Sequence, residues 1–215
     1  MSNIVSRIHY LSPKQNRAAM RYRILDQHGL NFLTLTVVEW IDLFTRRAFA
    51  DIVIESLRWC QQNKGLEIYG FVLMPSHLHL IARAGSEAEL SAILQSFKSF
   101  TASSILEYLK DTTRPESRRE WLLNHFAFNA RRNKTNSQHQ VWQRDNHPVN
   151  LYSPYVIRQK LGYIHNNPIE AGIVAEAEHY MLGSATNYAT GKGVLDVMVM
   201  EDLWNDIGYV QTTGN

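Results

Sequence analysis

The chain has 215 residues, of which 45% are hydrophobic and 20% charged, with one cysteine and a formal net charge of +2. This composition is typical of a globular protein with a sizeable core, and it excludes a disordered chain, a collagen-like repeat and a coiled coil. No apolar run approaches the roughly 18 residues of a membrane span, and Met1 to Tyr10 lack the apolar segment of a secretory signal. Because a lone Cys60 allows no internal disulfide, we expect a cytoplasmic protein without a membrane partner.

The charges are unevenly distributed along the chain. After Lys192 the sequence has four acids and no bases, which predicts an acidic C-terminal extension over about residues 194–215. Residues 110–140 hold seven bases against three acids and are predicted to form a basic insertion. Such a stretch is typical of a surface for a phosphate backbone, but it is equally typical of a solvated loop.

Hydrophobic periodicity predicts alternating strands and helices. In chain order we expect a strand over residues 31–39, a helix to about Asn63, strands over 66–74 and 77–84, a helix to about Leu109, a fourth strand within 141–151 and a helix from about Ser153 to Asn166. Residues 1–30 are mixed and polar, with Arg17, Arg21 and Arg23 in a short helix or arm. The basic stretch shows little periodicity except around residues 121–128.

Capping and breaking residues place the ends of these helices. Asp42 or Thr45 is predicted to cap the first helix, and Lys64-Gly65 to end it. Ser86 and Glu89 resemble a capping box for the second helix. Pro168 is predicted to end the last long helix, because proline disfavours helical dihedrals in the residue before it.

The order of these elements indicates the fold class. A strand, a helix, two strands joined by a Pro75-Ser76 turn, a helix and a further strand fit an α+β protein with a ferredoxin-like split βαβ and an antiparallel sheet. In that fold the helices cover one face of the sheet and leave the other face open.

The segment His77-Leu78-His79-Leu80 is the first candidate site. Side chains alternate along a strand, so both histidines point to one face and both leucines to the other. Two imidazoles at this spacing can bind one divalent metal ion, although a pair of surface histidines is an equally simple interpretation of the pattern alone. Because the leucines supply the core, the histidines are expected on the open face.

The segment from Lys160 to Pro168 is the second candidate site. Ile157, Leu161 and Ile164 can pack inward, which leaves Tyr163 on another side of the helix, one turn from Asn167. A tyrosine hydroxyl can attack a phosphodiester, whereas a lone helix tyrosine more often packs or forms a hydrogen bond. His165 points about 200° away from Tyr163, so we expect a structural role for it.

Together the two motifs resemble those of the HUH single-tyrosine transposases, and among these the REP-associated tyrosine transposases of the IS200-like superfamily. The resemblance runs through most of the chain, in the segments NFLTLTVVEWIDLFTRR, KGLEIYGFVLMPSHLHLIAR, VWQRDNHP, KLGYIHNNPIEAGIV and YMLGSATNY. Two histidines alone are unspecific, but the pair together with YIHNNP at this separation is specific.

The resemblance implies a role for each motif residue. His77 and His79 would be ligands of a Mg²⁺ or Mn²⁺ ion, Asn167 its third ligand and Tyr163 the catalytic nucleophile. It also implies one HUH transposase-like domain over residues 1–215, with a ferredoxin-like core at about 31–175 and the tyrosine helix on the open sheet face. Family members occur as monomers and as homodimers.

The resemblance further implies that single-stranded DNA containing a REP-like hairpin is the partner. Family members cut such DNA, remain joined to the 5′ phosphate and free a 3′-OH that can rejoin strands. The expected DNA-binding residues, besides the N-terminal arginines, are Arg114, Arg118, Arg119, Arg131, Arg132, Lys134 and Arg144. Three alternatives stay open: a domesticated hairpin-binding protein with little or no turnover, a metal hydrolase of small phosphoesters, and an RNA substrate.

Overall fold

The computed structural model describes residues 23–134 and 137–200. Its strands are β1 (Asn31–Thr36), β2 (Leu66–Met74), β3 (His77–Ala84) and β4 (Val149–Asn150), and its α-helices are α1 (Arg47–Lys64), α2 (Leu90–Lys110), α3 (Arg119–Arg132), α4 (Pro154–Glu170) and α5 (Ala185–Thr190). Three short 3-10 helices are η1 (Val38–Trp40), η2 (Leu43–Thr45) and η3 (Ala177–His179). Arg17, Arg21 and most of the predicted acidic extension lie outside the described residues.

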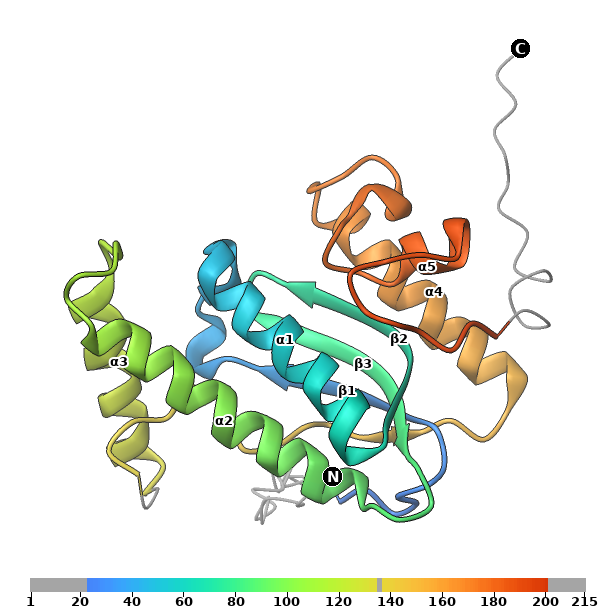
Figure 1. Ribbon diagram of the computed structural model, residues 1–215, viewed down its shortest axis with the longest axis horizontal. Coiled ribbons are helices and arrows are strands. Elements are labelled where there is room, and N and C mark those ends of the chain that lie inside the picture. Colours follow the sequence, from blue (N-terminus) through green and yellow to red (C-terminus); the bar gives the residue numbers. More distant parts are fainter. Residues whose placement is uncertain (1–22, 135–136, 201–215) are drawn as a thin grey trace, which may run out of the picture.

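The four strands form one antiparallel sheet in the order β2-β3-β1-β4 (Figure 1). This order arises when β1-α1-β2 and β3-α2-β4 are two crossover units interleaved in one sheet, which is the split βαβ arrangement. The predicted α+β class with a ferredoxin-like core is therefore confirmed.

The two faces of the sheet carry separate cores. Alternate residues of β1, β2 and β3, including Leu33, Leu78 and Leu80, pack against α1 and α2 in the larger core. The opposite face packs against α4, where Leu161 and Ile164 meet a smaller set of strand residues. The helix that carries Tyr163 thus covers the face that α1 and α2 leave open, as predicted.

A β-bulge lets α4 approach the sheet closely. The pairing of β2 with β3 shifts register between Ile68 and Gly70, and beyond the bulge Phe71 and Leu73 point into the larger core. A Cβ atom on Gly70 would lie 2.8 Å from Cδ1 of Leu161, which is closer than carbon atoms pack. Glycine at this position lets the backbone of β2 and the side chain of Leu161 lie in direct contact without a shift of that side chain.

The C-terminal segment covers the outer edge of β2. Leu73 and Ser184 donate backbone hydrogen bonds that join β2 to residues 182–184, and the Ser184 hydroxyl accepts a 3.0 Å bond from the Phe71 amide. The His165 Nε2 atom lies 3.0 Å from the same hydroxyl and the side chain is 4% exposed, which agrees with the predicted structural role. An edge strand paired in this way is protected from pairing with another chain.

Both predicted helix caps are wrong. Helix α1 begins after Arg46 with no side-chain cap, because the Asp42 carboxylate instead accepts a 2.6 Å bond from Arg118 and the Thr45 hydroxyl donates to the Asp42 carbonyl. Helix α2 begins after Glu89, and its Ser91 amide donates instead to the side-chain carbonyl of Gln27 at 2.9 Å. The predicted end of α1 is correct, since Gly65 has a left-handed φ of 66°.

The later elements differ from the predictions more. The basic stretch contains α3, a helix of 14 residues, in place of a single amphipathic turn. The fourth strand is only two residues long, with one isolated bridge between Val37 and Trp142 before it. Helix α4 continues through Pro168 to Glu170. The proline removes one helical hydrogen bond, but it is buried and its carbonyl accepts from Ile173 at 2.9 Å.

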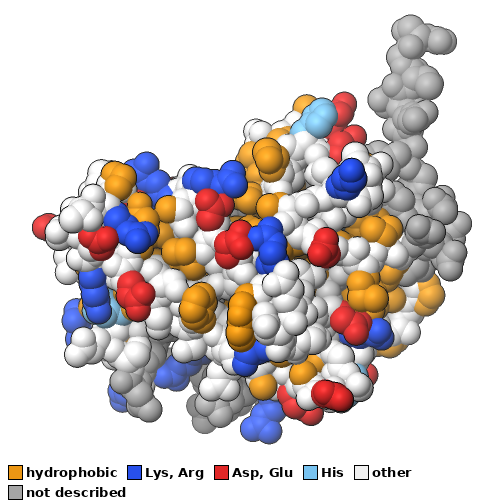
Figure 2. Space-filling view, viewed as in Figure 1, with side chains coloured by type: hydrophobic (Ala, Val, Ile, Leu, Met, Phe, Trp, Pro, Cys, Tyr) orange, Lys and Arg blue, Asp and Glu red, His pale blue; other side chains and the backbone are white. Residues whose placement is uncertain are grey.

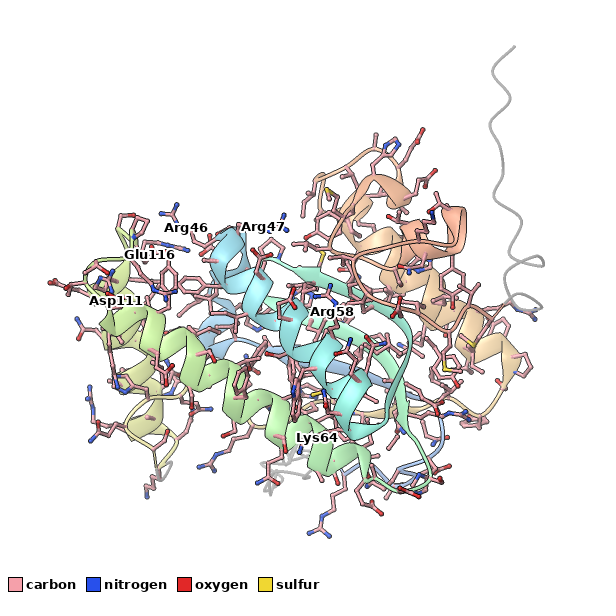
Figure 3. The ribbon with its side chains drawn as sticks, viewed as in Figure 1. Arg46, Arg47, Arg58, Lys64, Asp111 and Glu116 are labelled. Atoms are coloured by element: carbon pink, nitrogen blue, oxygen red, sulfur yellow. The ribbon has the colours of Figure 1, made fainter. Side chains whose placement is uncertain are left out.

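An ion pair ties the start of α1 to the connection between α2 and α3. The Arg46 Nε atom lies 3.2 Å from a carboxylate oxygen of Glu116, whose side chain is 1% exposed (Figure 3). Glu116 is buried and also accepts a 2.9 Å bond from the Arg118 amide, with the Arg118 Nε atom 3.7 Å away, so two arginines compensate its charge. None of the helices among the described residues is long and apolar enough to cross a membrane.

The contact at Gly70 gives a test of how α4 is held. A Gly70→Val substitution forces the branched side chain against Leu161, so we expect the free energy of unfolding to fall by about 1–3 kcal/mol. In the matched variant Gly162→Ala the new Cβ has open space within α4, so stability should rise by about 0.5–1 kcal/mol. Urea unfolding of both variants measures this; equal stability of Gly70→Val and wild type would contradict the contact.

Candidate active site

Strand β3 presents its two histidines toward α4. Leu78 and Leu80 point into the core under α1 and α2, so the alternation of the strand places His77 and His79 on the other face, as predicted. The His79 side chain is 4% exposed, and His77 is half-buried. The two imidazole ring centroids lie 4.6 Å apart at an interplanar angle of 75°.

Each imidazole is oriented by a neighbouring hydroxyl group. Thr34, which pairs with His79 across β1 and β3, has its Oγ1 2.9 Å from His79 Nδ1. The Ser76 hydroxyl lies 3.1 Å from Nδ1 of His77. When Nδ1 carries the proton and donates to the hydroxyl oxygen, the lone pair of each ring is on Nε2.

Both histidines are held in the neutral form. Burial lowers the pKa of His79 to about 3, and repulsion from Lys160, and from His77 when it is protonated, lowers it further. Burial also lowers the pKa of His77. Neutral imidazole is the form that binds metal ions, so this pair fits two ligand positions of a divalent ion.

Tyr163 is brought to the histidines by α4. Its neighbours Leu161 and Ile164 are fully buried, whereas the Tyr163 side chain is 43% exposed. Its hydroxyl lies 3.4 Å from Nε2 of His79, and the two ring centroids are 5.2 Å apart. A hydroxyl and an imidazole from positions 84 residues apart therefore meet at one accessible point.

Aromatic and basic side chains border this point. Phe32 stacks on His79 at a centroid distance of 5.3 Å, and the Lys160 ammonium lies 4.8 Å from the Phe32 ring. The same ammonium lies 5.7 Å from the Tyr163 ring centroid. A positive charge at this position can attract an anionic group to the tyrosine hydroxyl.

Asn167 is hydrogen-bonded within α4. Its side-chain nitrogen donates a 3.2 Å hydrogen bond to the Tyr163 carbonyl, one turn back along α4. This bond uses the amide nitrogen and not the amide oxygen, which is the atom that would bind a metal ion. Within residues 23–134 and 137–200, no group of three or more His, Cys, Asp or Glu side chains is arranged to hold a metal ion.

Three of the predicted DNA-binding arginines are engaged within the protein. Arg114 pairs with Asp111 at 3.0 Å, and Arg118 pairs with Asp42 at 2.6 Å. Arg119 donates to the carbonyls at the end of α2, which are otherwise without partners. On the face formed by α1 and α2, basic side chains are interspersed with acidic ones (Figure 2).

The other predicted residues cluster near the end of α3. Arg132 bonds to Glu39 at 3.3 Å, and Arg144 donates to the carbonyls of Asn133 and Lys134. Arg131 and Lys134 are exposed and form no ion pair within the described part of the chain. Arg131, Arg132, Lys134 and Arg144 therefore form the more open half of the predicted basic surface.

The sequence analysis missed Lys98, which fixes the segment that follows α3. Its ammonium donates to the carbonyls of Gln143 and Arg144 and to the Asn146 side chain, at 2.6, 3.2 and 2.7 Å. Burial lowers the pKa of Lys98 to about 8, while Asp145 acts in the opposite direction. The available signal was a lysine that interrupts the apolar stripe of α2 between Leu94 and Ile105.

Comparison with known proteins gives one family. Residues 36–144, about half of the chain, match the IS200-like transposase family; this range includes both histidines and ends before Tyr163. A REP-associated tyrosine transposase bound to a REP hairpin is similar with a TM-score of 0.55 and 14% sequence identity, over 80% of this chain and 87% of that chain. A candidate transposase of Deinococcus radiodurans R1 is 17% identical, with a TM-score of 0.39, over 68% of this chain and 97% of that chain. No curated protein matches the sequence.

The environment of Lys98 predicts a pH dependence of stability. Between about pH 8 and the ordinary lysine pKa of 10.5, the unfolded chain binds more protons at this position than the folded protein. The free energy of unfolding of the wild type should therefore rise over this range relative to Lys98→Met, by as much as roughly 3 kcal/mol. Denaturant titrations at several pH values measure the difference, and parallel curves for the two proteins would contradict it.

Proposed function

Since this chain belongs to the IS200-like transposase family, we propose that it is a metal-dependent endonuclease and strand transferase that acts on single-stranded DNA through a 5′-phosphotyrosine intermediate. The observation that carries the proposal is the 3.4 Å distance between the Tyr163 hydroxyl and His79 Nε2. An exposed tyrosine beside two histidines whose pKa values are lowered, one of them buried, is typical of a functional site.

Tyr163 is the proposed nucleophile. Its oxygen would form a bond to the phosphorus of a phosphodiester while the bond from phosphorus to the 3′ oxygen breaks. The tyrosine proton is lost, and the departing oxygen takes up a proton to become a free 3′-OH. In the reverse direction a 3′-OH attacks the phosphotyrosine and rejoins a strand, so the same residue serves cleavage and transfer.

His77 and His79 are the proposed metal ligands, with Asn167 as the third. The ion, Mg²⁺ or Mn²⁺, would polarise the scissile phosphate and neutralise charge that develops on it. Thr34 and Ser76 would hold the two imidazoles in the orientation that directs Nε2 away from the sheet. Lys160 would attract the phosphate to the same point.

DNA that contains a hairpin is the proposed substrate. The structurally similar REP-associated tyrosine transposase is bound to a REP hairpin. In this chain the exposed Arg131 and Lys134 and the neighbouring Arg132 and Arg144 would contact the DNA backbone. Arg114, Arg118 and Arg119 have partners within the protein, so a contribution from them would require those contacts to be shared.

A Tyr163→Phe substitution tests the nucleophile. With end-labelled single-stranded hairpins from the flanks of its own gene and Mn²⁺, the wild type should form a denaturant-resistant protein–DNA band and the variant none. Hairpin affinity should stay within about twofold, because only one hydroxyl is lost. Tyr155→Phe is the matched control, since Tyr155 lies on the same helix and is 69% exposed.

The remaining outcomes of this experiment separate the alternatives. Hairpin binding by the wild type without an adduct, in Mg²⁺ and in Mn²⁺, would favour a hairpin-binding protein with little turnover. Hydrolysis that survives in Tyr163→Phe would favour a metal hydrolase with water as nucleophile. Placing a single ribose at the scissile step tests whether RNA is accepted.

A Thr34→Val substitution tests the orientation of His79. The variant keeps the shape of the side chain but loses the 2.9 Å contact to Nδ1, so the Mn²⁺ concentration for half-maximal adduct formation should rise about 10–100-fold. Thr186→Val is the control, because its hydroxyl donates to the Glu178 carbonyl, away from the histidines. An unchanged metal requirement in Thr34→Val would remove Thr34 from the site.

A further inference from the structure

A cavity of about 440 Å³ lies between η1, the end of α3 and the segment that Lys98 fixes. A volume of this size lies in the range of sites for small organic ligands. Its lining is polar and consists of Val38, Glu39, Asn129, Arg132, Asn133, Gln140, Gln143, Arg144 and Asp145. Three of these residues belong to α3 and its end, so the basic insertion builds one wall of the cavity.

The cavity opens beside the candidate active site. Val38 and Glu39 line it, and the next residue, Trp40, has its ring centroid 5.2 Å from that of His77. The Trp40 side chain is 58% exposed. Trp40 therefore joins the pair of histidines to the lining of the cavity, and its exposed ring is open to a base of a strand bound at Tyr163.

The backbone between the active site and the cavity adopts a conformation that is unusual for its residues. Glu39 and Trp40 have φ values of 55° and 56°, in the left-handed region that side chains other than glycine rarely adopt. Glu39 is held there by His125 at 2.8 Å and Arg132 at 3.3 Å, both from α3. Backbone strain of this kind is characteristic of binding and catalytic positions.

The polar groups of the cavity fit one nucleobase better than the others. Arg132 and Arg144 supply guanidinium donors, and Asp145 supplies a carboxylate that forms no hydrogen bond or ion pair within residues 23–134 and 137–200. Guanine presents two adjacent acceptors, O6 and N7, to an arginine and two adjacent donors, N1–H and the 2-amino group, to a carboxylate. Adenine, cytosine and thymine lack that combination.

We propose that this cavity takes up one unpaired guanine base close to the scissile phosphate, and that Trp40 stacks on the neighbouring base, between the cavity and Tyr163. Asp145 reads the N1–H and 2-amino edge, and an arginine reads O6 and N7. The proposal rests on the function proposed above, because it assigns the base specificity of the same reaction. It makes the segment that follows α3, with Arg144 and Asp145, the part of the chain that selects the cleavage position.

Equilibrium binding in the Tyr163→Phe background tests the cavity without any cleavage. The probes are hairpins with short single-stranded flanks that carry guanine, inosine or 7-deazaguanine at each flank position in turn. At one position, replacing guanine by inosine, which lacks the 2-amino group, should weaken binding about fivefold or more. Adding Asp145→Asn should abolish that difference, and Trp40→Ala should weaken binding of every flanked probe about tenfold.

Two variants control for folding and for the second edge of the base. Glu87→Gln, in the exposed connection between β3 and α2, should keep the full preference for guanine. Arg144→Gln should lose the preference for guanine over 7-deazaguanine while it keeps the preference over inosine, which assigns the two edges separately. Asp145→Asn, Trp40→Ala and Glu87→Gln should bind the hairpin without flanks as the parent does. For Arg144→Gln each affinity is compared with its own affinity for that hairpin, because Arg144 is also a proposed backbone contact.

The outcomes separate this proposal from the proposed function. Equal affinity for all bases at every flank position, or a guanine preference that survives both Asp145→Asn and Arg144→Gln, would overturn the cavity as a base site. If the wild type forms no covalent adduct, the proposed chemistry is overturned. The binding measurements in Tyr163→Phe still test whether the cavity binds guanine.

Discussion

Tyr163 reaches the histidines because α4 packs closely against the sheet, with Leu161 and Ile164 buried in the smaller core and the Leu161 side chain directly over Gly70 of β2. The bulge at that point keeps Phe71 and Leu73 in the larger core while the backbone turns toward the helix. On β3 the strict alternation then directs leucines to one core and histidines to the other face. The position of the Tyr163 hydroxyl therefore depends on how closely α4 packs on the sheet, to which the small size of Gly70 contributes.

A second set of contacts joins the inserted helix to this centre. Glu39 accepts bonds from His125 and Arg132 of α3, and Lys98 of α2 fixes the segment that follows α3. The two segments that border the cavity, η1 and the residues after α3, are thus each held by side chains of α2 or α3. Because η1 also carries Trp40 beside His77, a shift of α3 would be transmitted directly to the ring of a candidate metal ligand.

The sequence predicted what depends on local pattern. The strands and the face of His77 and His79 follow from periodicities of two and of three to four residues, which can be recognised within a short stretch of sequence. The fold class follows from the order of the elements. The helix caps failed because Gln27, 64 positions from Ser91, supplies the cap of α2, and because Asp42 is taken by Arg118. Helix α3 was missed because its buried stripe is narrow, with Leu122, Phe126, Asn129 and Ala130 among many charged residues.

Counting charges was also a poor guide to the basic surface, and the reason is physical. An arginine near a helix end can satisfy carbonyls that have no partner in the helix, as Arg119 does for α2, and can balance a carboxylate, as Arg118 does for Asp42. Such side chains add to the net charge of a segment while their donors are already used. A phosphate-binding surface therefore has to be assigned from the donors that remain available, which on α3 are those near its C-terminal end.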